Sequence, residues 1–459
     1  MKRQPLAVIA DAAFLIAGLF VLYTVFGGAV RWKTALFRIT LTEPTRPLQI
    51  CLLALVIKML FGLERGLFAS LSTRRLPAVS PLAARLHQLD RYLHALFVAH
   101  WANLVLVVAV VMGSLGLFEL YSRQFPQTLP QALGNHLATG YHTGPSGIYR
   151  YSSELRMNLM RPSYERRMYF NGYTWHHKTD SLGFRNPVER ATASVVLLGD
   201  SMVYGHGLEE TSTVRHHLEA LLGQPVANLG IQGNAIHQEY QVLKTYGLRL
   251  RPRYVFLFFL ANDVDDLGAA LTDSELIAFL KTSVTDHTTP YFEIDRRPAR
   301  PFDLEAYLAE LYVVKAFDFL WQSLRAHGLR RAEAAEAHWR TLPPFQDRPR
   351  MALAMEFHLH ALRKIQDLAD RHRFAFVNVF TYTGTGVFPQ EPIYEGLLES
   401  FCHTHGIAFL SLRSPVEQAI ESGQDVFLKR DGHFSDRGAS LAAEVLARYV
   451  DDHPPPARP

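Results

Sequence analysis

Ser201 is the residue of this sequence best placed to act as a nucleophile. It lies in the segment GDSMVYGHG, directly after the apolar run 194–198, and a helical pattern begins at about Thr213. We therefore expect Ser201 at the carboxyl-terminal edge of a buried strand, where ligands bind in open α/β sheets. A serine hydroxyl is a weak nucleophile when unassisted, so this position calls for a neighbouring base.

His433 and Asp431 are the candidate base and its partner. They lie in LKRDGHFSDRG, on a loop before the last helical pattern of the chain. Asp431 could accept a hydrogen bond from one imidazole nitrogen and direct the other toward Ser201. In isolation the same residues fit a turn that carries a surface histidine. Together with the GDS segment they predict a triad of Ser201, His433 and Asp431.

Acyl chemistry also needs donors for the negatively charged oxygen of a tetrahedral intermediate. Gly233 in ANLGIQGN follows the second strand-like run, and Asn262 in FFLANDVDD follows the third. We expect both at the same sheet edge as Ser201, so that the backbone N–H groups of Ser201 and Gly233 and the amide of Asn262 form an oxyanion hole. The simpler reading of Asn262 is a helix cap after the strand.

Strand-like and helical patterns alternate along the second half of the chain and predict an α/β domain over residues 186–450. The apolar runs are almost continuous, as expected for parallel strands that are buried on both faces. A mostly helical insertion, predicted over about 265–350 and including 304–327, would serve as a lid or a recognition element. The five predicted strands are 194–198, 226–229, 254–260, 374–380 and 407–412.

Residues 1–120 are predicted to form a transmembrane region of about three helices. The uncharged run 12–30 has nearly the length that a membrane-spanning helix needs, and 47–63 and 92–118 are further candidates. A cleaved signal peptide is the competing interpretation of the first run, but no small-residue cleavage site follows it. The distribution of lysine and arginine places the amino terminus inside and the domain after residue 120 outside, which is the periplasm in a Gram-negative bacterium.

Between these regions, residues 121–185 suit a linker or a surface-packed extension with a hairpin. Asn171 and Gly172 stand between two aromatic-rich segments and can supply the positive φ angles of a tight turn. The tail 451–459 is predicted to be disordered.

Composition argues against several classes of function. The net charge is +4 and the arginines form no stripe with interleaved aromatics, so nucleic-acid binding is not expected. The two cysteines exclude a cysteine-rich metal site, and the histidine pairs 176–177 and 216–217 lack metal-ligand spacing. No cofactor and no metal are therefore predicted.

In these motifs the sequence resembles the SGNH/GDSL hydrolase superfamily over about residues 180–450. The resemblance implies a flavodoxin-like three-layer sandwich that hydrolyses or transfers acyl groups, with Ser201, Gly233, Asn262 and the Asp431–His433 pair in the family's order. Two positions depart from the family pattern: Leu260 replaces a glycine, and a single residue separates Asp431 from His433, where many members have two. The stretch TDSLGFR resembles membrane-linked bacterial members associated with polysaccharide modification.

The sequence thus predicts a membrane-anchored serine esterase or acyltransferase that works through an acyl-Ser201 intermediate. Its expected substrate is an acylated carbohydrate or lipid, above all the O-acetyl groups of an envelope glycan, and polysaccharide assembly proteins are possible partners. The alternative is an idle membrane-tethered scaffold of such an assembly system. A channel or transporter with an accessory domain is disfavoured, because the apolar segments contain few charges.

Overall fold

The computed structural model describes residues 103, 105–288, 304–323, 349–384, 388, 390–429 and 431–456 and the antiparallel pair β1 (Val30–Lys33) and β2 (Arg38–Leu41). The chain divides into two compact units, Met1–Leu115 and Gly116–Pro459. Among the described residues, one helix, Val105–Gln124, is long and apolar enough to cross a membrane. It overlaps the end of the predicted span 92–118. The predicted span 47–63 lies outside the described residues, as does 12–30 apart from the residue that opens β1.

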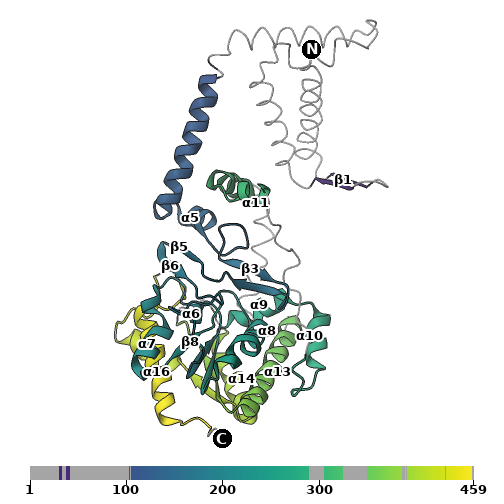
Figure 1. Ribbon diagram of the computed structural model, residues 1–459, viewed down its shortest axis with the longest axis vertical. Helices are drawn as coiled ribbons and strands as arrows, with labels where there is room; N and C mark the ends of the chain where they lie inside the picture. Colours follow the sequence, from purple (N-terminus) through teal and green to yellow (C-terminus); the bar gives the residue numbers. More distant parts are fainter. Residues whose placement is uncertain are drawn as a thin grey trace. The chain divides into compact units, whose positions relative to one another are not determined.

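A five-stranded parallel sheet forms the centre of the second unit (Figure 1). Its strand order is β11-β10-β9-β7-β8, which is the flavodoxin-like order 2-1-3-4-5. The α/β prediction and all five predicted strands are confirmed. The strands are β7 (Val195–Leu198), β8 (Val226–Asn228), β9 (Tyr254–Phe259), β10 (Ala375–Phe380) and β11 (Ala408–Ser411).

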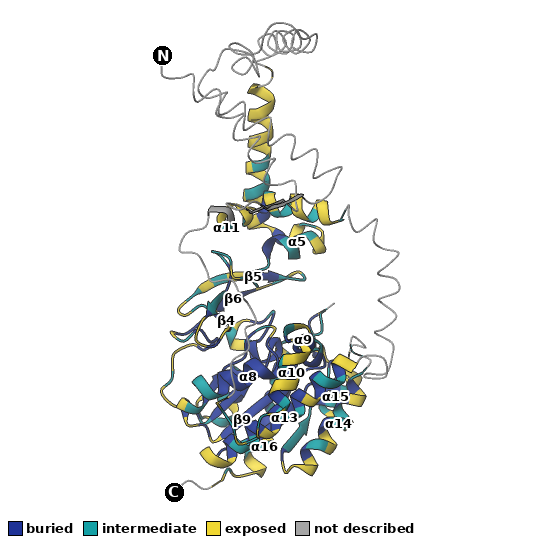
Figure 2. Ribbon diagram, turned by 90° about the vertical axis from the view of Figure 1, so that its right-hand side faces the viewer, coloured by how far each residue is buried: buried dark blue, intermediate teal, exposed yellow. Residues whose placement is uncertain are grey.

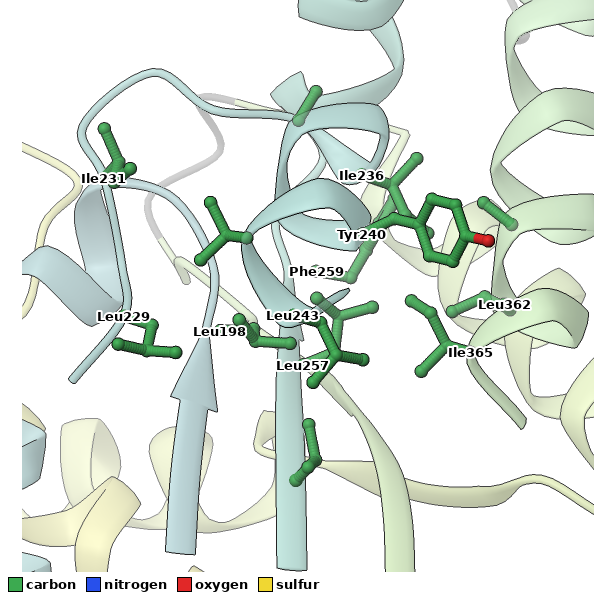
Figure 3. Close-up of a cluster of buried hydrophobic side chains, with 14 of the residues drawn as sticks. Leu198, Leu229, Ile231, Ile236, Tyr240, Leu243, Leu257, Phe259, Leu362 and Ile365 are labelled. Carbon is green, nitrogen blue, oxygen red and sulfur yellow. The ribbon is translucent and has the colours of Figure 1, made fainter. Parts of the chain in front are cut away.

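Helices cover both faces of the sheet and bury alternate side chains of each strand. On one face, Val195 and Leu197 of β7 belong to a core cluster with residues of α7 (Val214–Leu222), α15 (Arg413–Glu421) and α16 (Asp436–Asp452). On the other, Val196 and Leu198 contact a core that includes α8 (Ile236–Val242), α13 (Pro349–His372) and α14 (Glu391–Thr404) (Figure 3). β7, β8 and β9 are buried along their whole length (Figure 2), which explains why their sequences lack polar alternation, whereas the edge strand β11 is only partly buried.

The first part of the predicted insertion belongs to this core. α9 (Asn262–Ala270) and α10 (Asp273–Leu280) pack on α13, and the Phe279 and Phe357 rings stack 3.8 Å apart. These helices are therefore not a lid. The helix expected over 304–327 is interrupted: α11 (Leu304–Ala309) ends before a second helical stretch at 312–323, and 324–327 lie outside the described residues.

The segment 121–185 is also more than a linker. It contains α5 (Gln131–Ala138) and two antiparallel pairs, β3 (Tyr149–Ser152) with β4 (Met157–Met160) and β5 (Glu165–Phe170) with β6 (Tyr173–Lys178). Met168 and Trp175 are buried in the same core as the sheet. Asn171 and Gly172 have φ angles of 50° and 89°, so the predicted hairpin turn is confirmed.

His358 on α13 gives a prediction for stability against pH. Its ring is buried against Phe259, and burial lowers its pKa to about 3. Because the unfolded chain has an ordinary histidine pKa, protons bind preferentially to the unfolded state, and His358 weakens the fold as pH falls below about 6.5. Lowering the pH from 7 to 5 should therefore reduce the free energy of unfolding of the unmodified protein by about 2 kcal/mol more than that of the variant His358→Phe. Denaturant unfolding of both proteins at the two pH values measures this difference. Equal losses of unfolding free energy in the two proteins would contradict the prediction.

Candidate active site

A sharp turn from β7 into α6 (Ser201–Tyr204) positions Ser201. Asp200 caps the short helix, and its carboxylate accepts the Met202 N–H at 3.0 Å. The preceding Gly199 leaves no room for a side chain, since a Cβ there would lie 2.6 Å from Val203. The turn therefore requires glycine and starts the helix with the serine at the carboxyl-terminal edge of the sheet.

The structure brings Ser201, His433 and Asp431 together. The Ser201 Oγ lies 2.7 Å from His433 Nε2, and His433 Nδ1 is hydrogen-bonded to the Asp431 carboxylate. The carboxylate favours the tautomer with its proton on Nδ1, which leaves Nε2 free to accept the serine proton. The single-residue spacing in DGH is compatible with this arrangement, because Asp431 folds back on His433 and also accepts its backbone N–H at 3.1 Å.

Backbone pairing holds the loop that carries the two residues. Phe427 and Phe434 form an antiparallel bridge, and the Leu428 N–H donates to the His433 carbonyl at 2.9 Å. Ser435 then caps α16, where its hydroxyl accepts the Gly438 N–H at 3.1 Å. The loop is thus closed at its base, and the imidazole is held toward Ser201.

Asp431 is kept ionised by its neighbours. Burial raises the pKa of its carboxyl, but the hydrogen bond and charge of His433 and a hydrogen bond from Asn171 outweigh burial and lower that pKa to about 2. Asp431 therefore carries a negative charge at every pH at which the enzyme would work, and it can stabilise a protonated His433.

His206 is a site residue that the sequence analysis missed, although it lies in the same GDSMVYGHG segment. Its ring stacks on His433 with centroids 4.1 Å apart, and its Nε2 lies 3.7 Å from the Asp431 carboxylate. The Tyr141 hydroxyl lies 2.7 Å from its Nδ1. Burial and the nearby His433 lower the pKa of His206 to about 3. His206 is therefore uncharged and packs against the imidazole without repelling a proton on it.

Asn171 is a second missed residue, since the sequence indicated only its turn geometry. Its side-chain amide donates to Asp431 at 3.0 Å. The amide is itself held from α5, because Asn135 donates to the Asn171 side-chain oxygen at 2.6 Å and accepts the Asn171 backbone N–H at 2.7 Å. The segment 121–185 thus supplies Asn171, which positions Asp431 of the triad.

The variant Asn171→Gly should lower kcat about tenfold, because a hydrogen bond to a charged group contributes roughly 1.5–3 kcal/mol. Glycine keeps the positive φ of the turn, so the fold should be retained. Steady-state kinetics should show a lower kcat with an unchanged KM. Asn135→Ala, which removes only the support of Asn171, should have a smaller effect in the same direction. An unchanged kcat in Asn171→Gly would show that the hairpin does not position Asp431.

The TDSLGFR stretch is hydrogen-bonded to the carboxyl-terminal end of α6, the helix that begins with Ser201. The Asp180 carboxylate accepts the N–H groups of Leu182, Gly183 and Phe184 at 2.9–3.0 Å, which sets a tight loop. From this loop the buried Arg185 donates to the carbonyls of Tyr204 and Gly205 at the end of α6. The motif therefore connects the β5–β6 hairpin to the helix that begins with Ser201.

Gly233 and Asn262 lie at the expected edge, after β8 and at the start of α9. Gly233 has a φ of 76°, and its N–H donates to no acceptor among the described residues. Asn262 donates from its amide to Asp266 at 2.9 Å. Burial raises the pKa of Asp266 to about 6, although the bond from Asn262 opposes this shift. In the part of the chain that the structure describes, neither residue is hydrogen-bonded to Ser201 or His433.

The histidine pairs considered for metal binding contact single carboxylates: His176 lies 3.0 Å from Glu165, and His217 lies 3.0 Å from Asp436. His176 is exposed and His177 is buried, as expected for neighbours on the strand β6. Within the described ranges, the group close enough to hold a metal ion is His206, Asp431 and His433, whose ligand atoms lie within 4.8 Å of one another. Asp431 is already engaged by His433 and Asn171, so this group fits an acid–base site better than a metal centre.

One family model matches the end of this chain, and several solved structures are similar to it. Residues 394–458, which include Asp431 and His433, match the family model described as the SGNH hydrolase-like domain of the acetyltransferase AlgX. Similar solved structures include the acetylxylan esterase Axe2 from Geobacillus stearothermophilus, at 12% identity over 57% of this chain and 96% of that chain with a TM-score of 0.33. Another is LAE5, an alpha/beta hydrolase from the metagenome of Lake Arreo, at 14% identity over 57% and 97% with a TM-score of 0.32. No curated protein matches the chain.

Proposed function

We propose that this chain, which carries an SGNH hydrolase-like domain, cleaves or transfers ester-linked acyl groups through a covalent acyl-Ser201 intermediate. One observation carries the proposal: the Ser201 Oγ lies 2.7 Å from an imidazole nitrogen whose ring is oriented by a buried carboxylate. A nucleophile, a base within hydrogen-bond reach and a group that orients the base are the parts that such catalysis requires.

In the first half-reaction Ser201 attacks the ester carbonyl while His433 Nε2 takes its proton. The tetrahedral intermediate collapses, the bond to the leaving alkoxide breaks, and the His433 proton passes to that oxygen. In the second half-reaction His433 takes a proton from water or from an acceptor hydroxyl, whose oxygen attacks the acyl-enzyme. The bond between the acyl group and the Ser201 Oγ then breaks, and His433 returns the proton to the Ser201 Oγ. Hydrolysis and transfer thus use the same residues and differ in the acceptor.

The negatively charged oxygen of each intermediate would be bound by the N–H groups of Ser201 and Gly233 and the amide of Asn262. Support comes from their common position at the carboxyl-terminal edge of the sheet and from the unengaged Gly233 N–H among the described residues. Asp266 would orient the Asn262 amide through its 2.9 Å hydrogen bond.

The variant Asn262→Ala should reduce kcat about 10²- to 10³-fold, the usual loss when one oxyanion donor is removed. Asp266→Asn is the matched control, since it changes the partner of Asn262 and retains Asn262 itself, and its loss should be much smaller. The rate of acyl-enzyme formation, followed by stopped flow with a chromogenic ester, measures both. Equal kcat values for Asn262→Ala and the unmodified protein would remove Asn262 from the site.

The proposed substrate is an O-acetylated envelope glycan or a similar acylated carbohydrate or lipid. The acetyltransferase in the description of the matching family supports the acetyl group. The helix Val105–Gln124 supports attachment to a membrane. We propose a multi-pass protein of the inner membrane with its catalytic domain in the periplasm, next to polysaccharide assembly proteins.

A fluorophosphonate probe and an acetyl ester test this function together. The purified protein should react with the probe at Ser201 and release the chromophore from the ester, and mass spectrometry should find an acetyl group on the peptide that contains Ser201. Adding a sugar acceptor then separates transfer from hydrolysis by the ratio of acetylated sugar to acetate. A folded protein that reacts with neither reagent would instead be the idle scaffold.

A further inference from the structure

The helical stretch 312–323 has one face that is packed against the domain. Tyr312 is buried with Leu137, Ala138 and Tyr169, and the Phe319 ring lies 5.5 Å from that of His136. α11, which precedes this stretch, lies beside α5 in both views (Figures 1 and 2). The contacts of this inward face hold the stretch 312–323 against α5.

The outward face of the same stretch is also apolar. We call it the apolar ridge, and it consists of Val314, Phe317, Leu320 and Trp321. Phe317 is 62% and Leu320 is 56% exposed. Val314, Phe317 and Leu320 follow one another at intervals of three residues, and Trp321 lies four residues after Phe317, which places all four on one side of a helix. A helix that faced water on this side would carry polar residues there, and contiguous exposed apolar residues of this kind mark an interaction surface.

The segment that carries the ridge is fixed to the end of the apolar helix Val105–Gln124. The Glu119 carboxylate accepts the Val313 N–H at 2.9 Å. Arg123 donates to the Glu310 carbonyl at 3.3 Å and lies over the Tyr312 ring at 4.8 Å. Glu119 is also the first charged residue after the uncharged run 105–118. In a membrane-spanning helix, the first charges after the apolar run mark the level of the lipid headgroups.

From this attachment we infer that the apolar ridge inserts into the headgroup and acyl boundary of the membrane that Val105–Gln124 enters. The inference rests on the membrane attachment proposed above. Trp321 suits the boundary because its ring has an apolar body and a polar N–H, and α11 adds the exposed Tyr307. A lipid surface is the occupant that both the chemistry of the ridge and its place beside the end of the helix favour.

Such a contact would set the orientation of the catalytic domain. α5 receives the inward face of 312–323, and Asn135 of α5 holds Asn171, which holds Asp431. With the apolar ridge as a second membrane contact beside the helix Val105–Gln124, rotation of the domain relative to the bilayer would be restricted. The distance between the site and the bilayer surface would then be fixed.

Fluorescence quenching in proteoliposomes tests the inference. The full chain, with Cys51→Ala and Cys402→Ala, is reconstituted in phosphatidylethanolamine and phosphatidylglycerol vesicles and labelled with an environment-sensitive fluorophore at Phe317→Cys. Leu221→Cys on α7, an equally exposed apolar position at 54%, is the matched control, and Val110→Cys reports on the apolar helix. Quenchers are nitroxide-bearing lipids and aqueous iodide.

We expect lipid nitroxides to quench the label at 317 severalfold more than the label at 221, and iodide to show the opposite order. Iodide quenching at 317 equal to that at 221 would overturn the inference, and so would protection of 317 from both quenchers, which would mean that protein covers the ridge. If the label at 110 is also unquenched by lipid, the membrane attachment itself fails. If lipid nitroxides quench the label at 110 but not the label at 317, the membrane attachment holds and only the proposed insertion of the apolar ridge is wrong.

Discussion

Replacing Ser201 by alanine should lower acyl-transfer activity by at least ~10⁴-fold and abolish labelling by a fluorophosphonate, because Ser201 is the described residue whose hydroxyl is hydrogen-bonded to His433 Nε2. The fold should be retained. The Ser201 hydroxyl contacts Asp200 at 3.1 Å and His433 at 2.7 Å, and a single hydrogen bond contributes about 1 kcal/mol. Ester turnover and thermal unfolding of the same preparation measure the two effects.

Ser440→Ala is the matched control for this experiment. Ser440 lies on α16, its hydroxyl is 3.2 Å from Glu444, and it has no contact with the triad. This variant should keep full activity and probe labelling. If Ser201→Ala retained substantial turnover at normal stability, another residue would be the nucleophile, and the function proposed for this edge of the sheet would fail.

The variant Asp431→Asn should lower kcat by roughly 10³- to 10⁴-fold, because an amide cannot enforce the Nδ1–H tautomer or stabilise a protonated His433. Its hydrogen-bond partner Asn171 remains, so the side chain should stay in place. Since the pKa of Asp431 is about 2, its removal should depress the whole pH–rate profile and should not delete an acidic limb near neutrality.

Two readouts distinguish loss of charge from loss of structure in this variant. The midpoint of thermal unfolding should change little, and the fluorophosphonate should still react at Ser201, although slowly. The variant Asn171→Gly should reproduce the direction of the kcat effect at a fraction of its size. A kcat near that of the unmodified protein would mean that His433 works without Asp431, as a Ser–His dyad.

The five strands could be located from the sequence because parallel strands buried on both faces are nearly continuous apolar runs. The extent of the core could not be predicted from the sequence. α9 and α10 resemble an insertion, since Asp265 and Asp266 interrupt their apolar pattern, yet Leu267, Leu276 and Phe279 are buried on α13. Burial of this kind depends on a partner helix almost a hundred residues away along the chain, which no local pattern contains.

The candidate triad could be named in advance because few residue types can serve as nucleophile, base and acid, and the strand ends restrict where they meet. The residues that position the triad were not predictable in the same way. Asn171 and Asp431 are 260 positions apart, and an Asn-Gly pair is fully explained by its turn. His206 carried a weak local signal, because it lies five residues after Ser201, but its stacking on His433 depends on the folded loop.

The split of the site along the chain has a consequence for when the protein becomes reactive. Ser201 is synthesised more than two hundred residues before His433, and its helix can form while the base is still absent. In the proposed mechanism, the Ser201 hydroxyl has no base until the DGH loop docks on the Asn171 turn. With the proposed roles of Ser201 and His433, reactivity would begin only after synthesis has passed residue 433, and prematurely terminated chains that lack this loop would be inert.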